Sequence, residues 1–242
     1  MRKLILLLIV LLSYTLTIGQ TYSSKVSYKE RLEKVLEQLN LTDSVCLKDF
    51  FVEKQLSYSK SLFAMIVPKI VHIEDDYFEL DSYILLVDSA GKITNKYYEP
   101  KTLFSSAVRL ESIEIDTLSY CLNDNTMAFG VLVHYIGSSR PNPYSESNIS
   151  LFISNKDSLV QVLENCTIAD YSGEWDTNCE GQFISREGIL TMSKDTTNGF
   201  SNIVVKYKYT TQTNTKVDDD CIYEENITYD TKTLKFIDGM YK

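Results

Sequence analysis

The sequence predicts a mainly β fold, an antiparallel β-sandwich or barrel-like domain with a short N-terminal α-helical segment. Two observations indicate this class. From about residue 60 onward, apolar side chains recur with a period of two, and turn-forming clusters separate these runs at fairly regular spacing. The alternation of strands and helices that builds a parallel sheet is missing from the pattern. With 242 residues, 44% of them hydrophobic, the composition is typical of a folded globular chain.

The first nineteen residues are typical of a secretory signal peptide. Arg2 and Lys3 form a charged start, residues 4–12 are an unbroken apolar run, and the stretch up to Gly19 is small or polar. The apolar stretch is shorter than the roughly 20 residues that a membrane-spanning helix needs. We therefore expect an extracytoplasmic protein, periplasmic or secreted, with no membrane span once residues 1–19 are removed.

Acidic residues dominate the charge balance. The chain contains 33 Asp and Glu against 24 Lys and Arg, which gives a net charge of -9. Because the leader holds two of the basic residues, the mature chain would carry 33 acids against 22 bases, or -11. A chain this acidic lacks the broad cationic surface that phosphate backbones require, so nucleic acid is not an expected partner.

Residues 20–60 are expected to form a helical segment that packs on a β-rich domain comprising residues 61–242. Ser27 and Glu30 match a capping box, and the apolar residues behind them recur at helical spacing. This pattern predicts a helix from about residue 28 to residue 39. A further helical turn or two is expected around residues 44–53.

The remaining apolar runs predict strands. The first, residues 61–71, contains Pro68 and is expected to carry a bulge or a break. Residues 83–87 and 93–98 flank a hairpin turn in which Gly91 would supply a positive φ. Further strands are expected near residues 113–116, 129–135, 149–153, 159–168, 182–191, 203–210, 221–229 and 233–237.

Export into an oxidising compartment permits disulfide bonds. Five cysteines lie beyond the leader, an odd number that allows at most two bridges. We expect one bridge among Cys166, Cys179 and Cys221, with Cys46 and Cys121 as buried thiols.

One candidate binding segment contains the only tryptophan of the chain. Trp175 stands between Glu174 and Asp176 in a turn-like stretch. An indole face beside carboxylates suits a sugar, because the ring stacks on it and the acids accept its hydroxyls. The competing interpretation is structural, with Trp175 closing one end of the β domain and the acids solvated or capping backbone amides.

The other candidate segment is the polar loop at residues 137–145. Two prolines hold its backbone extended, which would present Arg140 and Tyr144 to a partner. Alternatively, Arg140 would pair internally with a carboxylate such as Asp176 and fix the loop in place.

No cofactor and no resident metal are expected. The sequence lacks the common glycine-rich nucleotide loops, the zinc-protease motif and the nucleophile elbow. Residues 218–220, all Asp, together with Glu224 and Glu225, form an acidic run that could hold calcium. The run lacks the alternate-residue spacing of known calcium loops, so a solvated turn is the competing interpretation.

Three segments resemble a family of uncharacterised exported bacterial proteins. They are residues 129–131, the string Gly-Ser-Ser-Arg-Pro-Asn-Pro-Tyr-Ser at 137–145, and the string Gly-Glu-Trp-Asp-Thr-Asn-Cys at 173–179. The similarity covers about residues 80 to 205. It implies a bacterial envelope setting and brings no known activity.

Three functions follow as hypotheses. The first is a non-catalytic binding module that recognises an envelope ligand, a glycan or a protein, through residues 137–145 and 173–177. The second is a hydrolase of envelope glycans or peptides that uses Glu174 and Asp176 as a carboxylate pair. The third is a structural envelope component with a large apolar surface patch.

Overall fold

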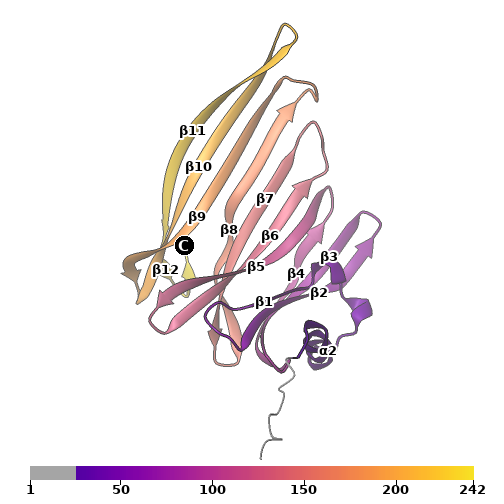
Figure 1. The fold of residues 1–242 in the computed structure, drawn as a ribbon, viewed down its shortest axis with the longest axis vertical. Helices are drawn as coiled ribbons and strands as arrows, with labels where there is room; N and C mark the ends of the chain where they lie inside the picture. Colours follow the sequence, from indigo (N-terminus) through magenta and orange to yellow (C-terminus); the bar gives the residue numbers. More distant parts are fainter. Residues whose placement is uncertain (1–25) are drawn as a thin grey trace, which may run out of the picture.

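The computed structural model describes residues 26–242, which form a mainly β fold with one α-helix (Figure 1). The predicted signal peptide, residues 1–19, lies outside the described residues. The helical elements are α2 (Tyr28–Leu39) and two 3₁₀ turns, Asp43–Val45 and Lys48–Phe50. The strands are β1 (Val52–Gln55), β2 (Leu62–Glu74), β3 (Tyr77–Asp88), β4 (Ile93–Ser105), β5 (Val108–Asn123), β6 (Thr126–Gly137), β7 (Tyr144–Asn155), β8 (Ser158–Trp175), β9 (Gly181–Thr197), β10 (Phe200–Val217), β11 (Asp220–Leu234), β12 (Phe236–Ile237) and β13 (Met240–Tyr241).

Strands β1 to β8 form a nearly closed, barrel-like sheet. Their order is β1-β2-β3-β4-β8-β7-β6-β5, and all neighbours are antiparallel except β4 and β8, which meet in parallel at Lys96 and Ser158. The two ends of this order approach each other, because Lys54 Nζ on β1 donates a hydrogen bond of 3.0 Å to the carbonyl oxygen of Ile115 on β5. Of the two predicted architectures, the structure therefore has the barrel-like one.

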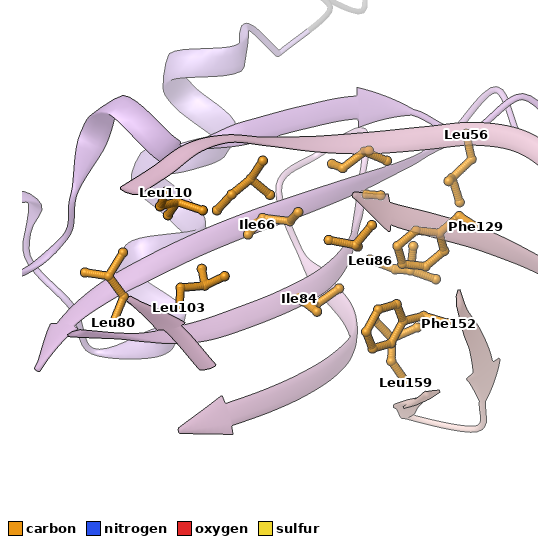
Figure 2. Packing of buried hydrophobic residues seen from close by; sticks show 14 residues of the cluster. Leu56, Ile66, Leu80, Ile84, Leu86, Leu103, Leu110, Phe129, Phe152 and Leu159 are labelled. Carbon is orange, nitrogen blue, oxygen red and sulfur yellow. The ribbon is translucent and has the colours of Figure 1, made fainter. Parts of the chain in front are cut away.

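Apolar side chains that alternate along these strands fill the space that the barrel-like sheet encloses (Figure 2). The buried members of this cluster are Leu56, Ala64, Ile66, Leu80, Ile84, Leu86, Leu103, Leu110, Ile113, Ile115, Phe129, Val131, Phe152 and Leu159. Figure 2 shows Phe129 and Phe152 next to each other, and their ring centroids are 5.9 Å apart. This cluster explains the period-two pattern of the sequence from about residue 60.

Strand β8 changes its neighbour partway along its length. It touches β4 at Ser158, whereas its residues 169–175 pair with β9, which is followed by β10 and β11. Asn165, with φ 41°, and several shifts in the β7–β8 register mark the irregular part of the strand between these halves. A second buried cluster, which includes Leu151, Val162 and Val205, joins β9–β11 to the barrel strands.

Helix α2 covers the opposite end of the sheet. Its bounds and its capping box, in which Ser27 and Glu30 exchange hydrogen bonds, confirm the helix predicted from the sequence. Val35 and Leu36 pack against a buried cluster that β2 and β3 supply, including Met65. In the described part of the chain, no helix combines the length and the apolarity that crossing a membrane requires.

Three local features differ in part from expectation. The stretch at residues 44–53 forms two short 3₁₀ turns and then enters β1, which pairs with β2. The bulge expected in residues 61–71 is confirmed by the shift of the β2–β3 register between Ile70 and His72, but Pro68 itself pairs in register with Ser82. Pro68 is tolerated there because β1 pairs with β2 only at Phe63–Ile66. The strand predicted at residues 233–237 is divided between the end of β11 and β12.

Candidate functional site

The structure brings the two predicted binding segments together. Loop 137–143 continues the edge of β7 along β8: the backbone amides of Gly173 and Trp175 donate to the carbonyl oxygens of Pro143 and Pro141 at 3.1 and 3.0 Å. The Trp175 indole Nε1 donates to the carbonyl oxygen of Arg140 at 2.6 Å. The contact between Arg140 and Trp175 therefore runs through the loop backbone and leaves the guanidinium outside it.

The Trp175 side chain takes part in the packing of the sheet. It is half-buried, its ring centroid lies 6.3 Å from that of Phe183, and its Cβ lies directly over Gly181. Phe183 in turn lies over Gly173. Two glycines thus make room for two aromatic side chains on one face of the β8–β9 pair.

The two carboxylates beside Trp175 have different surroundings. Asp176 Oδ1 accepts the backbone amides of Asn178 and Cys179, each at 2.8 Å, and these bonds hold the pKa of Asp176 below its ordinary value. Glu174 instead lines a shallow groove of about 380 Å³ beside Tyr144. Asp176 therefore organises the β8–β9 turn, whereas Glu174 is directed to the groove.

Arg140 lies exposed on the loop. Among the ion pairs between residues 26 and 242, none involves its guanidinium, and Asp176 is engaged by the turn. The internal pair considered between Arg140 and Asp176 is therefore not formed.

A disulfide bond links Cys179 to Cys221, two of the three cysteines expected to supply a bridge. It ties the β8–β9 turn to the start of β11, and the two Cα atoms are 5.7 Å apart. Cys46 is a buried thiol, as predicted, but the prediction for Cys121 is wrong, because this side chain is exposed. Cys121 points away from the core because the residues on either side of it in β5, Tyr120 and Leu122, are buried.

The acidic run lies at the tip of the β10–β11 hairpin. Asp218 and Asp219 form the turn and Asp220 begins β11. Glu224 and Glu225 follow on β11, where neighbouring side chains point to opposite faces. Within residues 26–242 no three His, Cys, Asp or Glu side chains are grouped to hold a metal ion.

An open pocket of about 500 Å³ lies on the side of the barrel, and we call it the lateral pocket. It lies where β4 and β8 diverge after their single pairing. Its lining residues are Thr102, Leu103, Phe104, Ser106, Val108, Val133, Tyr135, Tyr144, Glu146, Asn148, Asn165 and Thr167. Of the predicted site residues, only Tyr144 belongs to this set.

One wall of the lateral pocket is apolar. The ends of β4, β5 and β6 supply Leu103, Phe104, Val108, Val133 and Tyr135. The rings of Phe104 and Tyr135 lie 5.5 Å apart, and burial raises the pKa of the Tyr135 hydroxyl. This wall offers a ligand an aromatic and aliphatic surface.

The part of the lining that β7 supplies, directly beside β6, is polar, and its side chains are fixed by hydrogen bonds. The Glu146 carboxylate accepts from the Tyr144 hydroxyl and from the Asn148 amide. The bond to Glu146 raises the pKa of Tyr144 to about 12, so the hydroxyl remains a donor at neutral pH. Both donors are uncharged, and no Lys, Arg or His is among the residues that line the pocket.

A smaller internal cavity extends the lateral pocket into the barrel and shares lining residues with it. Ser150 is the centre of a polar cluster there. Its hydroxyl oxygen accepts hydrogen bonds from Gln161 Nε2 at 3.2 Å and from the backbone amide of Asn165 at 3.0 Å. Glu99 also lines this cavity, and burial, with a smaller effect of Glu164, raises the pKa of its carboxyl. The depth of the pocket therefore combines apolar walls with a few fixed polar groups.

Sequence reasoning missed Glu146 and Asn148, although a signal was present. Tyr144, Glu146, Asn148 and Ser150 alternate with residues on the other face of β7, which predicts a polar stripe on one side of that strand. The contribution of β4 and β5 to the lining could not be inferred, because neither strand pairs with β7 and no local pattern places them near it.

Fold and pocket together define a β protein with a nearly closed barrel, an amphipathic lateral pocket and a three-stranded extension. No family of known proteins, no curated protein and no solved structure matches the chain.

Proposed function

We propose that the protein is an extracytoplasmic, non-catalytic binding module that holds a small amphipathic ligand in the lateral pocket. The observation that carries the proposal is the pairing of an apolar wall with a fixed polar wall around about 500 Å³. Ligand sites typically have volumes of roughly 300–1,000 Å³ and combine apolar lining with a few well-placed polar groups. The disulfide between Cys179 and Cys221 is consistent with an oxidising compartment.

The charge of the pocket narrows the ligand class. Glu146 faces the pocket and Glu99 lies deeper, whereas no Lys, Arg or His is among the lining residues of either cavity. A ligand that carries an ammonium or hydroxyl group as donor, attached to an apolar body, complements both walls. An anionic amphiphile would meet like charge at Glu146.

The polar wall is preorganised for binding. The hydrogen bonds that Tyr144 and Asn148 donate hold the Glu146 side chain in place before any ligand arrives. Preorganised groups lose little conformational entropy on binding, which favours affinity. Tyr144 also lines the shallow groove that contains Glu174, so a larger ligand could continue from the pocket toward the segment of residues 173–177. The resemblance to exported bacterial proteins supports an envelope setting for this role.

The first experiment asks whether the lateral pocket binds apolar molecules. N-phenyl-1-naphthylamine, whose fluorescence rises in apolar surroundings, is titrated into the purified protein. Val108→Trp fills the mouth of the pocket and should raise the Kd at least tenfold, about 1.4 kcal/mol. Ile189→Trp adds the same indole on the exposed face of β9, where the side chain is 68% exposed, and should change the Kd less than twofold.

The second experiment tests the role of the Glu146 charge. Octylamine and octanol are compared as competitors of the probe, because they share a chain and differ in charge. Glu146→Gln should weaken competition by octylamine about tenfold and leave octanol nearly unchanged. Absence of saturable probe binding, or equal effects of Val108→Trp and Ile189→Trp, would overturn the proposal.

A further inference from the structure

Strand β11 presents a long free edge. It pairs with β10 on one side, and within residues 26–242 no strand pairs with its other side. Fourteen of its fifteen residues are exposed, and only Leu234 is buried. Figure 1 shows β10 and β11 extending together from the body of the protein. Such an edge offers a row of unpaired backbone amides and carbonyls to another strand.

Charged side chains are the one usual protection of an edge strand that β11 carries, and the backbone protections are missing from it. Proteins shield such edges with prolines, bulges or short strands, but β11 contains no proline and stays in one unshifted register with β10 from Asp220 to Leu234. Its exposed side chains include Ile227 and Tyr229, which are 43% and 77% exposed. A long edge strand with a regular backbone and exposed Ile227 and Tyr229 side chains is suited to pairing with a partner strand.

We propose that β11 pairs antiparallel with β11 of a second copy of this chain, about a two-fold axis at Thr228. In this register Glu224 faces Lys232 of the second copy, and the symmetry repeats that pair. On the other face of the strand, Ile227 faces Tyr229 twice, which gathers two isoleucines and two tyrosines into one apolar cluster. A two-fold axis normal to the sheet keeps each side chain on the same face of the sheet in both copies. Even-numbered residues therefore pair only with even-numbered residues, and odd-numbered with odd-numbered.

Charge complementarity favours this register over the two registers next to it. Lys232 is the only basic residue of β11, against four acids, so each copy must place that lysine opposite an acid. A shift of the axis to Ile227 places Glu224 opposite Asp230 of the second copy, and like charges directly opposite each other destabilise a sheet. A shift to Tyr229 places Glu224 opposite Leu234 and separates Ile227 from Tyr229.

The backbone contribution is substantial. Residues 224–232 form nine cross-strand pairs in this register, and alternate pairs exchange two hydrogen bonds each, which gives roughly 8 to 10 bonds. The dimer thereby continues one sheet from the first copy into the second. The two-fold arrangement is closed, so it stops at two copies and does not propagate into a fibre.

A charge exchange tests the register. Sedimentation equilibrium of the wild-type chain should show a monomer–dimer equilibrium, and Lys232→Glu should raise the dimer Kd at least tenfold, because it creates two repulsive pairs. Combining Lys232→Glu with Glu224→Lys should restore the Kd to within threefold of the wild-type value. Lys194→Glu, at an exposed position on β9, is the matched control and should leave the Kd unchanged.

Cross-linking tests the axis independently. Thr228 faces its own copy at a Cα separation of roughly 4.5–5.5 Å, which suits a disulfide. In a Cys121→Ser background, Thr228→Cys should form a covalent dimer on mild oxidation. Thr231→Cys should not, because its two copies are about 20 Å apart in this register.

Two outcomes would overturn the proposal. One is a chain that stays monomeric up to about 100 µM, the concentration range in which weak edge pairing is already visible. The other is a dimer whose Kd is unchanged by Lys232→Glu and which cross-links equally well through Thr228→Cys and Thr231→Cys. Far-UV circular dichroism of each variant confirms that the fold is retained.

Discussion

The ion pair between Arg31 on α2 and Glu53 on β1 is expected to hold the helix on the sheet. Arg31 Nε donates to Glu53 Oε2 at 3.1 Å, and a second guanidinium nitrogen donates to the other carboxylate oxygen. The two side chains are only 7% and 8% exposed. The guanidinium carbon also lies 4.1 Å from the centroid of the Phe63 ring, so the pair is enclosed by apolar neighbours.

Replacing Glu53 by Gln keeps the side-chain shape and leaves the Arg31 charge buried without its partner. Removal of one member of a buried pair costs about 3–5 kcal/mol of unfolding free energy, because the remaining charge stays desolvated. The exposed pair between Lys48 and Asp43 is the matched control, with a 2.7 Å contact and side chains about 60% exposed. Asp43→Asn should cost less than about 1 kcal/mol, because water screens that pair.

Equilibrium unfolding in urea, followed by far-UV circular dichroism at one protein concentration, measures both variants. The midpoint should fall strongly for Glu53→Gln and hardly at all for Asp43→Asn, with the m value unchanged. The double variant Arg31→Met with Glu53→Leu should recover most of the loss, since a buried apolar pair needs no counter-charge. Equal costs for Glu53→Gln and Asp43→Asn would refute the argument that burial determines the value of the pair.

Three further predictions concern the β8–β9 turn. Replacing Cys179 and Cys221 by Ser opens a loop with a sequence separation of 42 and should lower the unfolding free energy by about 4 kcal/mol by the loop-entropy relation, as measured by urea unfolding. Gly181→Ala places a methyl group against Trp175 and should cost about 1–3 kcal/mol and shift the Trp175 fluorescence maximum. Asp176→Asn should lower stability at pH 7, and because the folded-state pKa of Asp176 is depressed, the gap to the wild type should close as the pH falls below about 4.

Each of these predictions has its own contradicting result. A Cys121→Ser variant removes an exposed free thiol and should leave the unfolding free energy unchanged. If it lost as much unfolding free energy as the variant without Cys179 and Cys221, the disulfide would not be the cause of that loss. Unchanged stability and fluorescence in Gly181→Ala would show that the sheet relaxes around the added methyl group. A gap between Asp176→Asn and the wild type that widens toward acid would mean that the carboxylate does not stabilise the turn in its charged form.

Features determined by neighbouring residues were predictable. The capping box of Ser27 and Glu30 and the hairpin with Gly91 at φ 91° involve contacts over a few residues, so their pattern appears directly in the sequence. The contact between the 137–145 loop and Trp175 was expected as one surface but not as backbone pairing. The half-buried Trp175 ring packs near Phe183 and donates a hydrogen bond to the carbonyl oxygen of Arg140. Asp176 accepts hydrogen bonds from two backbone amides of the turn.

By itself, the sequence determined that this protein is mainly β, that a short helix precedes the sheet, and that one bridge would form among three cysteines. The first two properties follow from side-chain periodicity and local hydrogen bonding, which act over a few residues, and the third was inferred from export into an oxidising compartment. Tertiary structure alone decided that the sheet nearly closes, that β8 changes partners near Asn165, and that Glu146 and Asn148 line one pocket with Leu103 and Phe104 of β4. These relations depend on which strands, distant in the chain, become neighbours, and no local pattern encodes that choice.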